Sequence, residues 1–256
     1  MPEHTSFLTL LLAHMRETLD HNAQGILGPS VPSKLPPTWQ TFEPLAASLL
    51  VILIVLGVSL RVRSRLLKTD EALIPEDELT LRTFMEAFLA YFYDLAKSVM
   101  DNERAKKYFP VIGTAAVFVF FSNVMAMIPG MPIATSNINV TAGCALVVFI
   151  LFNAYGLATN GWSYIKHLAG PVWYMAPLVF PIEVISLLVR PVTLAVRLMV
   201  NMTADHLLLS SFLGLIALVL PIPVMMLGAI VVVVQTLVFT LLTCIYIGLA
   251  TEHEAH

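Results

Sequence analysis

Long apolar runs separated by short polar links make up most of this chain. A helix needs about 20 apolar residues to cross the hydrocarbon core of a bilayer. Runs of suitable length predict membrane helices at 44–60, 109–128 and 140–157, and two longer stretches follow at 172–220 and 223–250. The pattern therefore predicts an all-α polytopic membrane protein with about five membrane helices.

Residues 78–104 have a different pattern, in which acids, bases and aromatic residues alternate. Large apolar side chains recur there at helical spacing, at Phe84, Phe88, Tyr91 and Leu95. This spacing predicts an amphipathic helix. Such a helix lies either on the cytoplasmic surface of the membrane or against a partner protein.

Residues 1–40 are polar and contain several prolines, which predicts an external segment ahead of a single membrane domain, 41–256. A basic cluster directly follows the first apolar run, at Arg61, Arg63, Arg65 and Lys68. Basic residues collect on the cytoplasmic side of membrane proteins. We therefore expect the N-terminus outside and, after five crossings, the C-terminus in the cytoplasm.

The apolar stretch that begins at Pro181 contains an ordered set of polar residues. At 100° per residue, the set falls within about 80° of helical arc; its members are Glu183, Ser186, Arg190, Thr193, Arg197 and Asn201. Glu183 and Arg190 are seven residues apart, a spacing that predicts no direct ion pair along a helix. One interpretation of this stripe is a buried polar seam held by internal salt bridges.

Arg197 favours a second interpretation, because no acid lies three or four residues away from it. Ionisable residues at bilayer depth commonly mark ion paths. The negative charge that Arg197 requires is expected from water or from another chain.

The apolar character from Pro181 to Leu220 covers 40 residues. As a helix this stretch would be about 60 Å long, roughly twice the hydrocarbon thickness. Pro191 can kink it. Either the helix breaks near Thr203–His206, or it lies steeply tilted in the membrane.

Composition agrees with a membrane protein, since 58% of the residues are hydrophobic and 12% are charged, against about 25% charged in soluble domains. The formal net charge of −3 argues against nucleic acid as a partner. Cys144 and Cys244 lie in separate apolar segments and fit no disulfide framework or zinc motif. The chain has no nucleotide-binding or hydrolytic metal motif. We therefore expect no cofactor and no catalysis by this chain alone.

Several segments together resemble subunit a of the F-type ATP synthase membrane sector. RPVTLAVRLMVNMTADHL resembles the signature around the family's essential arginine, which falls on Arg197, and FPIEVISLLVRP resembles the stretch before it. VQTLVFTLLTCIYIGLATEHE resembles the closing helix and matches Gln235 and Tyr246. FFSNVMAMIPG and TSNINVT resemble the segments beside an external loop. The resemblance covers roughly residues 40–253.

The resemblance implies a stator subunit with two proton half-channels, whose last two helices form a long tilted hairpin around a ring of c subunits. The amphipathic helix would then lie near the b subunits of the peripheral stalk. Arg197 would face the ring carboxylates. The outer path would use Asn201, Asp205, His206 and Gln235, and the inner path Glu183, Ser186 and Arg190 with Tyr246 on the closing helix. The expected location is a bacterial inner (plasma) membrane.

Two positions depart from the pattern of many relatives. Those relatives have ionisable residues at positions 206 and 228, where this chain has His206 and Gly228, and an acid at the position of Ala126. Asp205 together with His206 is therefore the expected outer pair. The alternative functions are a self-contained secondary transporter or channel with a buried arginine site, and a structural membrane anchor. The absence of an inverted repeat argues against the transporter, and the charged stripe argues against the anchor.

Overall fold

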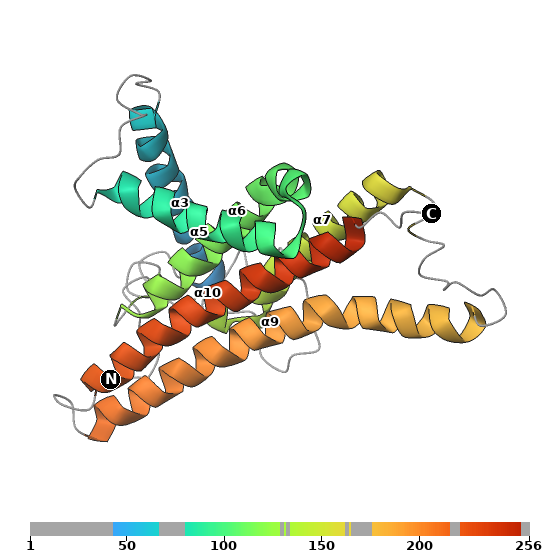
Figure 1. The fold of residues 1–256 in the computed structure, drawn as a ribbon. Helices are drawn as coiled ribbons and strands as arrows, with labels where there is room; N and C mark the ends of the chain where they lie inside the picture. The colour runs from blue at the N-terminus through green and yellow to red at the C-terminus, as the bar shows by residue number, and fades with distance from the viewer. Residues whose placement is uncertain are drawn as a thin grey trace, which may run out of the picture.

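A computed structural model describes residues 43–66, 80–128, 131, 134–161, 164, 176–215 and 221–251. These residues form the helices α3 (Glu43–Leu66), α5 (Leu81–Val99), α6 (Asn102–Ala126), α7 (Ile138–Asn160), α9 (Ala176–Leu215) and α10 (Pro221–Thr251), with the 3₁₀ turn η2 (Ala134–Ser136) (Figure 1). No strand occurs in this part of the chain. All helices except α5 contain a segment long and apolar enough to cross a membrane. The predicted all-α polytopic class is confirmed.

The sequence predicted one amphipathic helix over 78–104, but the structure divides this stretch between α5 and the start of α6. The helix α5 begins after its N-cap Thr80, whose hydroxyl accepts a hydrogen bond from the Thr83 amide, and it ends at Val99. Met100 has an extended backbone, and α6 starts at Asn102. The chain therefore turns inside the charged stretch, and the last charged residues belong to the membrane helix α6.

Aromatic side chains hold α5 against α6. The ring of Phe88 lies 4.9 Å from that of Phe120 and 4.8 Å from that of Phe92, measured between centroids. The polar face of α5 contains Asp94 and Lys97, which form an exposed ion pair at 3.3 Å. The structure shows α5 packed on α6 of its own chain, and its location on the membrane surface or against a partner protein stays a prediction.

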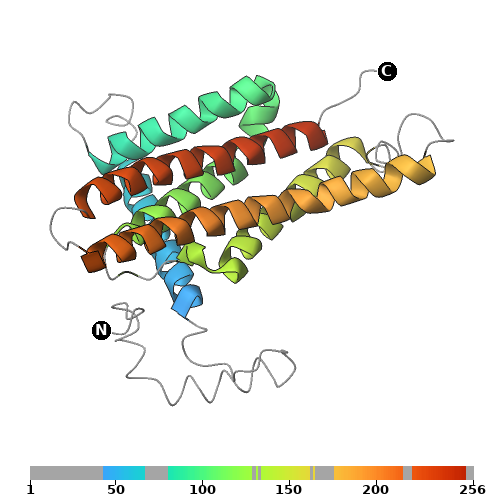
Figure 2. The ribbon, with the colours of Figure 1, turned by 90° about the horizontal axis from the view of Figure 1, so that it is seen from below.

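The helix α9 runs unbroken for 40 residues, with Pro181 and Pro191 inside it. A break near Thr203–His206, one of the two alternatives, is wrong. The helices α9 and α10 lie side by side and form a long hairpin (Figures 1 and 2). A helix of this length is about 60 Å long, roughly twice the hydrocarbon thickness. That α9 lies steeply tilted in the membrane therefore stays a prediction.

The core lies where α7 packs on α9 and where α6 packs on α10. Large side chains in it are fully buried, among them Tyr108, Phe152, Leu198 and Phe239. Several buried threonines of α10 donate their hydroxyls to the carbonyl four residues earlier, at 2.7–2.9 Å: Thr236, Thr240, Thr243 and Thr251. These polar side chains therefore need no partner on another helix.

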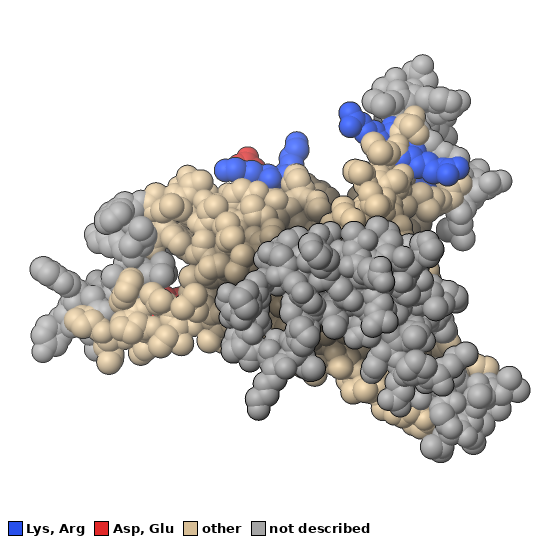
Figure 3. All heavy atoms as spheres, turned by 180° about the vertical axis from the view of Figure 1, so that it is seen from behind, with Lys and Arg blue, Asp and Glu red and all other residues tan. Residues whose placement is uncertain are grey.

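Basic side chains gather along one edge of the molecule (Figure 3). They belong to the C-terminal part of α3, with Arg61 and Arg63 exposed, and to the start of α6, with Lys106 and Lys107 exposed. Because basic residues collect on the cytoplasmic side of membrane proteins, we expect this edge to face the cytoplasm.

Candidate functional site

The hairpin brings two predicted outer-path residues into direct contact. The side-chain amide of Asn201 on α9 donates a hydrogen bond to Oε1 of Gln235 on α10, with 2.6 Å between the heavy atoms. Gln235 is 3% exposed. Both residues border a cavity of about 330 Å³ between the two helices, which also reaches Asp205. The two amides and the Asp205 carboxylate therefore line a cavity whose other walls are apolar.

Asp205 points from α9 toward α10, where Gly228 leaves room for it. A Cβ atom at position 228 would lie 2.8 Å from the Asp205 carboxylate, closer than a real contact allows. The absence of a side chain at Gly228 is thus the reason that the carboxylate can approach α10.

His206 points toward a third helix. Its Nε2 lies 2.9 Å from the backbone carbonyl oxygen of Ala126 at the end of α6. A carbonyl only accepts hydrogen bonds, so Nε2 carries the proton and Nδ1 is the basic atom of the neutral ring. Asp205 and His206 border the same small cavity of about 10 Å³, which is enough for about one water molecule.

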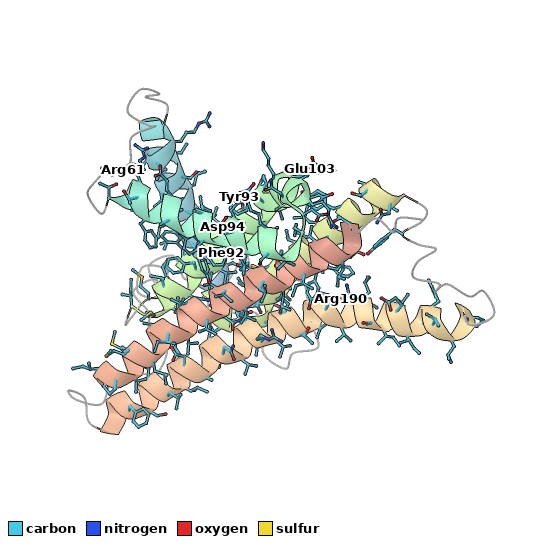
Figure 4. The ribbon with its side chains drawn as sticks, in the orientation of Figure 1. Arg61, Phe92, Tyr93, Asp94, Glu103 and Arg190 are labelled. Carbon is cyan, nitrogen blue, oxygen red and sulfur yellow. The ribbon has the colours of Figure 1, made fainter. Side chains whose placement is uncertain are left out.

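Predicted inner-path residues meet further along the hairpin, nearer the C-terminus of α10. Arg190 Nη2 lies 3.9 Å from Glu183 Oε1, and the Arg190 guanidinium lies 5.4 Å from the ring centroid of Tyr246. The prediction that Glu183 and Arg190 form no direct pair is wrong, because two long side chains extended toward each other span the two helical turns. Figure 4 shows Arg190 on α9 where the helix runs beside α10.

Arg197 lies between these two groups. It is exposed, and within the described residues it has no hydrogen bond or ion pair. Arg190 is about 10 Å from it along the helix axis, and Asn201 about 6 Å. Its neighbours Val196 and Val200 are 42% and 49% exposed. A permanent cation thus stands on an open apolar face of α9.

Ser186 also lies on this open face, one helical turn from Glu183 and from Arg190. It is exposed, and the structure gives its hydroxyl no contact with Glu183 or Arg190. Thr193, exposed as well, donates to the Arg190 carbonyl of its own helix at 2.9 Å. The polar stripe therefore divides into residues that contact α10 or one another and residues that face outward.

Sequence reasoning missed two further polar contacts. Asn123, fully buried in α6, accepts a hydrogen bond at 3.2 Å from Thr135 of η2. Tyr164, just after α7, donates a hydrogen bond at 3.0 Å to Asn153 of α7. Each asparagine is an amide within an apolar run, and that is the signal that could have identified them.

No group of three or more histidine, cysteine, aspartate or glutamate side chains suited to a metal ion occurs among the described residues. The arrangement instead offers amides, one imidazole and two carboxylates, spaced along a hairpin and separated by a lone arginine. Such groups can hold water and pass protons. The fold and site define a multi-pass membrane protein. Its last two helices form an apolar hairpin that contains two polar groups and, between them, an exposed arginine.

The family model described as ATP synthase A chain matches residues 45–248. Over 256 residues the chain is 56% identical to ATP synthase subunit a of Sorangium cellulosum (strain So ce56), with 100% of both chains covered. It is 36% identical over 250 residues to ATP synthase subunit a of Trichlorobacter lovleyi (strain ATCC BAA-1151 / DSM 17278 / SZ), covering 98% of this chain and 96% of the relative. It is 42% identical over 207 residues to ATP synthase subunit a 1 of Syntrophotalea carbinolica (strain DSM 2380 / NBRC 103641 / GraBd1), covering 81% and 84%.

The chain belongs to the ATP synthase A chain family. It is a proton-transporting membrane subunit within the F-type ATP synthase complex and is not an enzyme by itself. Membership in this family decides against the self-contained transporter and the structural anchor.

Proposed function

We propose that the two polar groups of the hairpin are two proton half-channels and that Arg197 separates them. The outer half-channel contains Asp205 and His206 and continues through Asn201 and Gln235. The inner half-channel contains Glu183 and Arg190 with Tyr246. Ser186, exposed on the open face, lines the inner half-channel where it meets the ring.

One observation carries this proposal. Arg197 stands on the open face of α9 between the two groups, and no described residue of its own chain neutralises it. A buried or membrane-embedded cation requires an opposite charge. A carboxylate on a ring of c subunits that passes along this face would supply it.

The chemistry follows from the permanent charge of arginine. Its guanidinium stays protonated and offers a rigid donor fork that matches a carboxylate. In the direction of ATP synthesis, a ring carboxylate that leaves Arg197 takes a proton from the outer half-channel. After rotation with the ring, it releases the proton into the inner half-channel and meets Arg197 ionised. The fixed cation also repels a hydrated proton and so prevents direct flow between the half-channels.

The proposed setting is a bacterial inner membrane, with the N-terminus outside and the C-terminus in the cytoplasm, and with b subunits of the peripheral stalk beside α5. The exposed basic residues at the start of α6 support this orientation. A membrane-impermeant thiol reagent added from outside should label cysteine at Ser136 and not at Lys106, in a background without Cys144 and Cys244. The reverse labelling would overturn the orientation.

Cross-linking tests whether the open face contacts the ring. Val196 is 42% exposed and Leu198 is fully buried, although both are near Arg197. A cysteine at Val196 should form an oxidative cross-link with a cysteine placed beside the ring carboxylate, and one at Leu198 should form none. If neither Val196 nor Val200 cross-links in the assembled complex, the ring does not lie on this face.

A further inference from the structure

Tyr164 lies just beyond the end of α7 and closes over its last turns. Its hydroxyl donates to Oδ1 of Asn153 at 3.0 Å, and the side-chain amide of Asn153 donates to the Phe149 carbonyl at 2.8 Å. The amide is therefore anchored to its own helix, and it fixes the direction of the phenol O–H. The lone pairs of the phenol oxygen stay available as acceptors.

The position of the Tyr164 ring depends on Gly156. A Cβ atom at position 156 would lie 2.9 Å from Tyr164 Cε2 and 3.0 Å from the carbonyl oxygen of Ala250. The missing side chain thus lets the ring and the last turn of α10 approach α7 together. Nearby, Asn160 donates to the same Ala250 carbonyl at 3.2 Å, which fixes α10 against α7.

The phenol lies within electrostatic range of the inner pair. Burial raises the pKa of Tyr164 above its ordinary value; the positive charge of Arg190 opposes this shift, and the negative charge of Glu183 adds to it. Among the described residues, Arg190 and Glu183 are the charged groups that act on the phenol. Tyr164, Tyr246 and Leu187 all pack against the same buried core cluster.

We propose that Tyr164 is a positioning residue of the inner half-channel, where its phenol oxygen, held in place by Asn153, accepts a hydrogen bond from the water that solvates the Glu183–Arg190 pair. This inference rests on the proposed inner half-channel and adds α7 and Tyr164 to its wall. Tyr164 moves no proton itself. It orders water at a point where the pair would otherwise face an aromatic ring and apolar side chains.

Proton conduction through the assembled membrane sector tests the inference. Vesicles stripped of the soluble ATPase head would be given an imposed potential, and the conduction rate would be normalised to complex content. Tyr164→Phe keeps the ring against Gly156 and removes only the hydroxyl. It should slow conduction roughly two- to tenfold, the range that one hydrogen bond represents in a rate. Tyr155→Phe is the matched control; its ring lies 4.8 Å from that of Tyr108, with the two planes tilted by 45°, and it should conduct as the wild type does.

Two more variants separate positioning from packing and from failure of the path itself. Asn153→Leu should slow conduction similarly, and combining it with Tyr164→Phe should add little, because both remove the same hydrogen bond. Additive losses, or a fall in complex content with an unchanged rate per complex, would overturn the inference. Glu183→Gln should slow conduction as well. If it does and Tyr164→Phe does not, only the role of Tyr164 fails; if Glu183→Gln conducts normally, the inner half-channel itself is wrong.

Discussion

Asp205 and His206 are adjacent on α9 and reach two different neighbouring helices. On a helix they point about 100° apart. Accordingly, the carboxylate of Asp205 approaches α10 at Gly228, and the imidazole of His206 reaches the end of α6. Both still border one small cavity. A water molecule there would contact an acid and a base at once.

Removing both groups should impair the outer path without preventing assembly. We expect Asp205→Asn combined with His206→Ala to slow ATP-driven proton pumping several-fold, because no side chain that lines the cavity could then exchange a proton with its water. Pumping is measured by quenching of a pH-sensitive dye in inverted vesicles. Ser211→Ala is the control; Ser211 lies on the same helix, is exposed, and donates only to the Leu207 carbonyl. Wild-type pumping by the double variant would assign both residues to structure alone.

Arg190 and Arg197 share one stripe and differ in their surroundings. Arg190 has an acid at 3.9 Å and an aromatic ring at 5.4 Å. Arg197 has neither and is exposed on the open face. The two cations therefore suit different tasks, Arg190 as part of a local polar group and Arg197 as a partner for another chain.

At the scale of the element, α7 is a helix whose two ends are fixed by different chemistry. Asn137 caps its start by accepting from the Asn139 amide at 2.9 Å, and Gly161 ends it with φ of 54°, a backbone conformation suited to glycine. Between these ends, Gly143 is exposed and Gly156 is buried against Tyr164 and α10. The same residue type thus has two different roles in one helix.

The two glycines of α7 predict opposite responses to one added methyl group. Gly143→Ala meets nothing within 4 Å and should be neutral or stabilise the helix by about 0.5–1 kcal/mol. Gly156→Ala would meet the Tyr164 ring and the Ala250 backbone and should destabilise by roughly 1–3 kcal/mol. The measurement is the temperature at which the detergent-extracted complex loses this subunit. Equal melting of the two variants would contradict the packing described around Gly156.

Hydrophobic pattern was a sound guide to the elements because membrane helices need long apolar runs. It predicted α7 and α10 to within a few residues. It predicted the start of α6 at residue 109 instead of Asn102, because the charged residues after Met100 were assigned to the preceding amphipathic helix. The contact between Glu183 and Arg190 was missed because helical spacing describes Cβ positions and ignores the reach of long side chains.

The hydrophobic pattern could not predict those contacts of the site that depend on how the helices pack. The contacts of Tyr164 with Asn153 and of His206 with Ala126 join residues whose proximity depends on how α7, α9 and α6 pack. No local periodicity encodes that packing. The stripe on α9 could be predicted, because one helix determines it. Its division into inward and outward residues required α10.

At the scale of the whole molecule, the two polar groups lie toward opposite ends of the hairpin. The outer group adjoins the C-terminus of α6, through the contact of His206 with Ala126. The inner group adjoins the C-terminal ends of α7 and α10, where Asn160 contacts Ala250. The two polar groups therefore lie beside different helix ends, and Arg197 stands on α9 between them.

The most direct measurement of this account is proton-driven ATP synthesis by Arg197 variants in inverted vesicles, with complex content checked by blotting. Arg197→Ala removes the charge, and Arg197→Lys keeps it without the bidentate fork. We expect both variants to assemble and neither to synthesise ATP, while Arg190→Ala, on the same face, retains substantial synthesis. Synthesis near the wild-type rate by Arg197→Ala would contradict the role of Arg197 as the residue that couples the ring to the two half-channels.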